Sequence, residues 1–269
     1  MIRLPAVIFL FFLSGNQWVS AQETKMEQYE QELVQISEKV DAARYGDSDS
    51  LTYYSDLFSH KLYSLLSRVY GTMKYPFNLL KEEHVCDIST SKDGLFRIYS
   101  WDTQTGGTMH FFKTIYQYKV NGEVRTKMCE LNEGDPGCFY SEIFTLKAKK
   151  KTYYLGIANG IYSTKDVSQS IQAFELTNTG VNDTIQLMKT PDGMKNSLDL
   201  SYDFFSVVDR PERPVAVIRY DEKKKIISIS LINEKGEIVP GYQYYVFNGT
   251  GFEPKLTETK GKSKGTQSN

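Results

Sequence analysis

Four residues in one short stretch carry the side chains best suited to binding a ligand: Arg97, Tyr99, Trp101 and His110. Successive residues of a strand point to opposite faces of a sheet, so Arg97, Tyr99 and Trp101 are predicted to share one face. A guanidinium beside two aromatic rings can bind a sugar ring or a peptide through stacking and charged hydrogen bonds. The alternative interpretation is that helices or a second sheet cover this face, which would make the same residues core.

The placement of His110 depends on the turn that follows this strand. A loop over residues 103–106 would place His110 on the face of Arg97, whereas a loop over residues 103–105 would turn it to the opposite face. The ligand-binding hypothesis requires the first of these registers and an accessible Trp101.

The sequence contains no pattern typical of a known catalytic site. GxSxG, HExxH and P-loop patterns are absent. Three histidines leave few candidates for acid–base catalysis. We therefore predict no catalytic residue, no metal site and no cofactor, and the sequence favours a non-enzymatic protein. A hydrolase remains an alternative, because the two carboxylates of a glycoside hydrolase need no fixed spacing along the chain.

The cysteines are Cys86, Cys129 and Cys138. The last two flank a segment rich in Asn, Gly, Asp and Pro, which is typical of a loop. Two strands leaving that loop would bring the thiols together, so a disulfide between Cys129 and Cys138 is predicted. Cys86 is then expected to be a buried free thiol. A metal site that uses His84 and Cys86 would lack the paired ligand spacing of known zinc sites.

Residues 1–21 are typical of a secretory signal peptide. Arg3 supplies a positive charge, and the apolar run at 7–13 is too short to span a bilayer as a helix. Small residues at 19–21 form a cleavage site and make Gln22 the predicted mature N-terminus. The protein is therefore predicted to be exported to the periplasm or the extracellular space, with no transmembrane segment.

Charge and composition limit the partners. The formal net charge is −1, so no general attraction to nucleic acid is expected. Residues 255–269 are rich in lysine and almost free of apolar side chains, which predicts a disordered basic tail.

Residues 22–71 predict an antiparallel helical hairpin. Apolar residues recur at spacings of three and four in two runs, with Gly46 and Gly71 where the helices are expected to end. The residues expected to dock the hairpin on the rest of the chain are Leu33, Ile36, Val40, Leu57, Leu62 and Leu66.

Residues 72–254 predict a mainly antiparallel β domain. Short strand-like segments are separated by turn signals such as Asn-Gly, and no helical period recurs between them. The predicted fold class is α+β, with the helical hairpin packed on stacked sheets or on a partly closed barrel. A propeller-like arrangement is a minor alternative, because its repeat signature does not recur.

The segment at 93–118, DGLFRIYSWDTQTGGTMHFFKTIYQY, resembles a stretch in uncharacterised exported proteins of Bacteroidota-type bacteria. Similar patterns lie at 154–163 (YLG, then GIYS), at 171–174 (IQAF) and around the Asn-Gly pair at 248–249. The resemblance implies an envelope or secreted location and no particular activity.

These observations predict a non-enzymatic binding or structural module of the cell envelope. Its partner would be a glycan, a peptide or an envelope protein, and not nucleic acid. The alternatives are a hydrolase acting on envelope or environmental polymer, and an accessory or chaperone-like protein that pairs through an edge strand.

Overall fold

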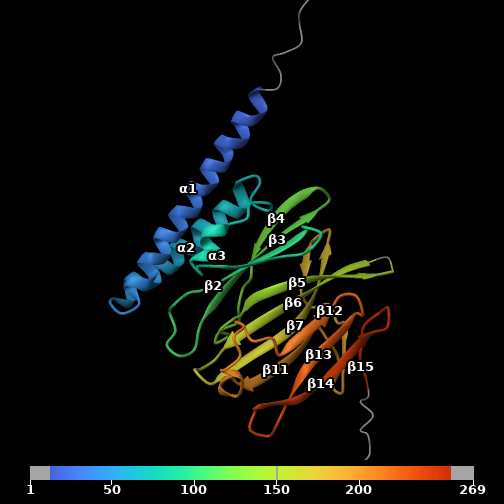
Figure 1. The fold of residues 1–269 in the computed structure, drawn as a ribbon. Coiled ribbons are helices and arrows are strands. Elements are labelled where there is room, and N and C mark those ends of the chain that lie inside the picture. The colour runs from blue at the N-terminus through green and yellow to red at the C-terminus, as the bar shows by residue number, and fades with distance from the viewer. Residues whose placement is uncertain (1–12, 150, 256–269) are drawn as a thin grey trace, which may run out of the picture.

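The computed structural model describes residues 13–149 and 151–255 (Figure 1). Most of the predicted signal peptide and nearly all of the predicted basic tail lie outside these residues. The described part begins with α1, which runs through the predicted cleavage site at 19–21 in this uncleaved chain. None of the helices in the described ranges is both long and apolar enough to cross a membrane.

The helices precede most of the sheet structure. Their bounds are α1 Leu13–Ala43, α2 Ser48–Arg68 and α3 Asn78–Glu82, with a 3₁₀ helix, η1, at Phe204–Val207. The turn between α1 and α2 is capped by Asp47, whose carboxylate accepts hydrogen bonds from the backbone N–H groups of Asp49 (3.3 Å) and Ser50 (3.1 Å). This cap satisfies two of the free N–H groups at the start of α2.

Three sheets follow. The first sheet has the order β1-β2-β3-β4. Its strands are β1 Asp87–Thr90, β2 Phe96–Asp102, β3 Phe112–Val120 and β4 Glu123–Met128. The second sheet has the order β11-β7-β6-β5, with β8 also paired to β7. Its strands are β5 Phe139–Ala148, β6 Lys151–Ile161, β7 Asp166–Thr177, β8 Gly180–Asn182 and β11 Ser197–Asp203.

The third sheet has the order β10-β9-β15-β14-β13-β12. Its strands are β9 Met188–Thr190, β10 Gly193–Lys195, β12 Ile218–Asp221, β13 Ile226–Ile232, β14 Ile238–Phe247 and β15 Phe252–Lys255. Every strand pair in the described residues is antiparallel except β15 with β9. None of the sheets closes into a barrel, so the predicted α+β class with stacked sheets is confirmed.

The helical hairpin and the three sheets form successive layers, and three apolar clusters join them. One lies between the helical hairpin and the first sheet, and includes Phe58, Leu62 and Tyr99. The next joins the first and second sheets, and the last joins the second and third sheets. Figure 1 shows the hairpin at one end of the molecule and the third sheet at the other. The amphipathic helices are thus stabilised by packing, because most helical stability in proteins comes from the burial of an amphipathic face.

Strand β2 is buried on both of its faces. Phe96 and Ile98 contribute to the cluster shared with the second sheet, whereas Tyr99 and Trp101 contribute to the cluster under the helices. The predicted alternation of this strand is therefore correct.

The segment that connects the hairpin to the first sheet is held by two buried charged residues. Arg97 Nη1 donates to the backbone carbonyl oxygens of Thr72 (3.1 Å), Met73 (3.3 Å) and Tyr75 (2.6 Å). From the other side, the carboxylate of Glu30 accepts from Leu80 N at 3.0 Å and from the Tyr75 hydroxyl at 2.9 Å. These bonds satisfy backbone groups that packing would otherwise leave buried and unpaired.

Candidate functional site

The helical hairpin covers the face predicted to bind a ligand. Only 5% of Arg97, 0% of Tyr99 and 3% of Trp101 is exposed to solvent. The guanidinium of Arg97 binds backbone carbonyls, and the hydroxyl of Tyr99 donates to Gln117 Oε1 at 3.0 Å. The hypothesis of an open aromatic face is therefore wrong, because α1 and α2 bury their own apolar stripes against it.

His110 adopts neither of the two predicted registers. Asp102 pairs with Phe112, so residues 103–111 form one long loop rather than a tight turn. The loop folds back on itself, since the backbone N–H of Thr103 donates to the carbonyl of Phe111 at 2.8 Å. His110 consequently lies in the loop, where its Nδ1 is 2.5 Å from Asp102 Oδ2.

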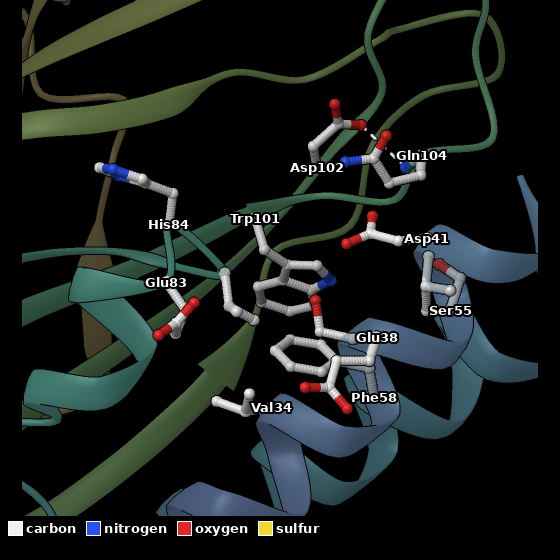
Figure 2. Close-up of a pocket in the computed structure, with 13 residues that line it drawn as sticks. Val34, Glu38, Asp41, Ser55, Phe58, Glu83, His84, Trp101, Asp102 and Gln104 are labelled. Atoms are coloured by element: carbon white, nitrogen blue, oxygen red, sulfur yellow. Dashed lines mark hydrogen bonds between the residues drawn. The ribbon is translucent and has the colours of Figure 1, made fainter.

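A pocket of about 140 Å³ opens at the margin of the covered face (Figure 2). It lies where α1 and α2 meet the end of β2 and the segment after α3. Its lining residues are Val34, Ser37, Glu38, Val40, Asp41, Ser55, Phe58, Glu83, His84, Val85, Trp101, Asp102 and Gln104. Of the four predicted ligand-binding residues, only Trp101 lines it.

Trp101 forms the aromatic wall of the pocket together with Phe58. The two ring centroids are 5.6 Å apart, with the ring planes inclined by 58°. The indole Nε1–H is buried and has no hydrogen-bond partner among the described residues. Figure 2 shows this nitrogen directed toward the hairpin side of the pocket, where Asp41 and Ser55 lie. A buried tryptophan N–H usually has an acceptor, so this donor is an unsatisfied buried group at the wall of the pocket.

Gln104 brings an acceptor to the same pocket. Asp102 Oδ1 accepts from the backbone N–H of Gln104 at 2.8 Å, and Gln104 adopts a left-handed backbone conformation with φ of 60°. Its side-chain Oε1 is buried and likewise has no partner within the described ranges. Two residues that line the pocket thus carry a buried polar atom without a partner in the described residues, a donor on Trp101 and an acceptor on Gln104.

The rim of the pocket is acidic. Glu38, Asp41 and Glu83 are exposed, and none of them forms a salt bridge with another described residue. His84 also lies on the rim. Carboxylates without a salt-bridge partner contribute a negative potential over a cleft, which favours cationic ligands.

The pair of Asp102 and His110 is the nearest approach to a catalytic arrangement. The carboxylate fixes the orientation of the imidazole ring, as it does in many acid–base sites. No hydroxyl or thiol group in the described part of the chain is hydrogen-bonded to the His110 ring. The described residues also contain no group of three or more His, Cys, Asp or Glu side chains that could hold a metal ion. Among the described residues, the pair of Asp102 and His110 therefore has no hydrogen-bonded nucleophile beside it.

The predicted disulfide between Cys129 and Cys138 is not formed, and all three cysteines are free thiols. β4 pairs with β3 in the first sheet and β5 pairs with β6 in the second, so the two strands do not make the expected hairpin. Burial raises the pKa of Cys129 to about 12 and that of Cys138 to about 11. Both thiols therefore stay protonated and unreactive at neutral pH. Cys86 is buried, as expected.

Most of the pocket was not predicted from the sequence, because it combines four separate segments of the chain. Val34, Glu38 and Asp41 share one side of α1 at spacings of four and three. This spacing is the one sequence signal of the site. It does not distinguish a pocket from an ordinary solvent-exposed helix face, because residues on any such face have the same spacing.

The chain was compared with protein-family models, with curated proteins and with solved structures, and none of the three comparisons found a match.

Proposed function

We propose that this protein is an exported, non-enzymatic binding module of a bacterial cell envelope, and that its ligand binds in the pocket beside Trp101. The observation that carries this proposal is the buried indole N–H without an acceptor. Leaving such a donor unpaired costs about 1–3 kcal/mol, and a ligand oxygen placed next to it would offset that cost.

The sequence offers a direct spectroscopic test of binding. The chain has two tryptophans, and Trp18 lies within the predicted signal peptide. The protein that begins at Gln22 would therefore report on Trp101 alone. In a screen of glycans, peptides and small polar compounds, we expect a saturable change in tryptophan fluorescence for the compounds that bind the pocket.

Trp101→Phe serves as the matched variant, since it retains an aromatic ring but removes the N–H donor. Its affinity for the compound found in the screen, measured by calorimetry, should fall by about tenfold. The control is Tyr242→Phe in the third sheet, which should bind like the unchanged protein. The proposal is contradicted if no compound perturbs Trp101, or if Trp101→Phe binds with unchanged affinity.

Export is supported by the charged, apolar and small-residue segments of the first 21 residues and by the resemblance of residues 93–118 to exported proteins. We expect mass mapping of the protein recovered outside the cytoplasm to give an N-terminus at Gln22. Recovery of an N-terminal peptide that still contains Met1 would show that no signal peptide is removed.

A further inference from the structure

Lysines from three turns come together at one edge of the stacked sheets. Each sheet contributes one turn: β1–β2 in the first, the tip of the β5–β6 hairpin in the second, and β12–β13 in the third. Lys225 Nζ donates to the carbonyl of Lys147 at 2.8 Å, which joins the second and third turns. Lys92 Nζ lies 3.7 Å from Glu222 Oε2, which joins the first and third. Figure 1 shows the β5–β6 hairpin extending away from α1 and α2. We call the following residues the lysine patch: Lys92, Lys147, Lys149, Lys151, Lys223, Lys224 and Lys225.

Carboxylates offset only part of this positive charge. Four acidic residues lie in the three turns or against them. Three of them form salt bridges with the patch, and these pairs are Glu222 with Lys92, Glu175 with Lys151, and Asp221 with Lys224. The fourth, Asp93, accepts hydrogen bonds from Ser91, Leu95 and Tyr154. Across β14 from the β12–β13 turn, a further carboxylate is paired outside the patch, Glu253 with Lys189.

Three lysines of the patch have no counter-ion. Lys147, Lys149 and Lys223 are exposed, and none of them pairs with a carboxylate within residues 13–149 and 151–255. The lysines of the patch outnumber its carboxylates, although the whole chain has a formal net charge of −1. The small net charge therefore conceals a local positive region, which attracts anions.

Turn geometry does not account for these lysines. Lys149 and Lys225 have positive φ angles of 34° and 54°. Glycine or asparagine adopts this left-handed conformation at a lower cost than lysine does. Both turns thus carry lysine in spite of backbone strain, which favours a role for the charge itself.

The kind of cation indicates the kind of anion. The patch contains lysines and no arginine, and lysine acts as a point charge, whereas arginine recognises one carboxylate or phosphate through two parallel hydrogen bonds. Proteins that hold a single polymer strand combine a charged groove with exposed aromatic rings. None of the patch lysines lines either of the two cavities found in the described residues. The rings beneath Lys151 and Lys225, which are Tyr153 and Phe247, are buried and half-buried.

We infer that the lysine patch binds the surface of a membrane that contains anionic lipids. Such a surface presents many negative headgroups at once, so all three turns can contact it without a groove and without a fixed geometry. Basic clusters at the surface of anionic membranes bind in this manner. The inference goes beyond the proposed pocket function and does not depend on it, because no patch residue lines that pocket.

The first test is sedimentation of the protein that begins at Gln22 with lipid vesicles. One set of vesicles is phosphatidylcholine alone, and the other is an equal mixture of phosphatidylcholine and phosphatidylglycerol. We expect the protein to sediment with the mixed vesicles and to stay in solution with phosphatidylcholine alone. Binding should weaken as sodium chloride is added, because salt screens interactions between exposed charges.

A triple variant identifies the surface that binds. Lys147→Gln, Lys149→Gln and Lys223→Gln together remove the three charges that have no counter-ion, and the affinity for the mixed vesicles should fall by on the order of a hundredfold. The matched control changes three exposed lysines outside the patch by Lys74→Gln, Lys81→Gln and Lys235→Gln. It has the same net charge and should bind like the unchanged protein. All of these proteins keep the lysines of residues 255–269, so the difference between the variants reports on the patch. Thermal unfolding of both variants should match that of the unchanged protein, since only exposed side chains are altered.

Three results would overturn the inference. The first is an absence of binding to the mixed vesicles at low salt. The second is equal binding by the two triple variants, which would assign any attraction to the net charge or to the C-terminal lysines. The third is binding to a soluble acidic polysaccharide, tested with alginate, that is tighter than binding to the vesicles and is lost in the patch variant. That result would assign the patch to a polymer instead of a membrane.

Discussion

Replacing Leu62 with alanine should lower the free energy of unfolding by about 2–5 kcal/mol. Leu62 lies on α2 with 0% of its surface exposed, within the cluster that joins the hairpin to the first sheet. The truncation removes buried apolar surface and leaves a cavity that the two helices and the sheet can fill only in part. Urea unfolding followed by Trp101 fluorescence measures the change, since Trp101 belongs to the same cluster.

The neighbouring residue provides the control for this experiment. Tyr63 is 37% exposed on the same helix, and Tyr63→Ala should change the stability much less than Leu62→Ala. An unchanged unfolding midpoint for Leu62→Ala would mean that the hairpin does not dock through this site. Equal losses for both variants would mean that the loss at Leu62 does not depend on its burial against the first sheet.

Arg97→Met should cost about 3 kcal/mol or more of folding stability. The substitution removes a buried charge, which by itself is favourable, and methionine fills much of the vacated volume. It also removes the donor shared by three backbone carbonyls of the connecting segment. Each buried acceptor left unpaired costs about 1–3 kcal/mol, so the loss of hydrogen bonds outweighs the gain.

Arg125→Met separates this effect from a general loss of positive charge. The Arg125 side chain is 38% exposed and pairs with Glu123, so its replacement should cost no more than about 1 kcal/mol. Thermal unfolding of both variants beside the unchanged protein gives the comparison. If Arg97→Met proved as stable as Arg125→Met, the connecting segment would not depend on the guanidinium.

The parts of the fold that follow from local periodicity could be predicted from the sequence. The stripe around Leu33 and Leu62 indicated two paired helices, and the alternation in β2 placed Phe96 opposite Tyr99. Which layer would cover the Tyr99 face could not be predicted, because periodicity shows that a face is apolar without showing what packs on it. The partners of Arg97 lie more than twenty residues away in sequence and are backbone atoms, which leave no side-chain signal.

The errors at the cysteines and at His110 have a shared physical origin. In both places the sequence predicted a hairpin between consecutive strands. After Cys129 the chain instead leaves the first sheet and enters the second. His110 lies within a long loop whose two ends are joined by a backbone hydrogen bond. Whether the next strand joins the same sheet or a different one is decided by tertiary packing. The amino-acid composition of the connecting loop does not encode that choice. The pocket could not be predicted for the same reason, since Glu83 and Gln104 line one pocket only after the hairpin and the first sheet have packed together.

The order of the helical hairpin and the three sheets along the molecule has a consequence for local unfolding. Each apolar cluster joins adjacent layers, so the structure approximates a one-dimensional stack in which an element is held mainly by its immediate neighbours. The helical hairpin is a terminal layer with one neighbour, whereas the first and second sheets have two. Local opening should therefore begin at the ends of the stack, as in repeat arrays. Because the pocket lies at the junction of the hairpin and the first sheet, the opening of that junction would release its contents. A ligand bound there would, in turn, stabilise the packing of the helical hairpin on the first sheet.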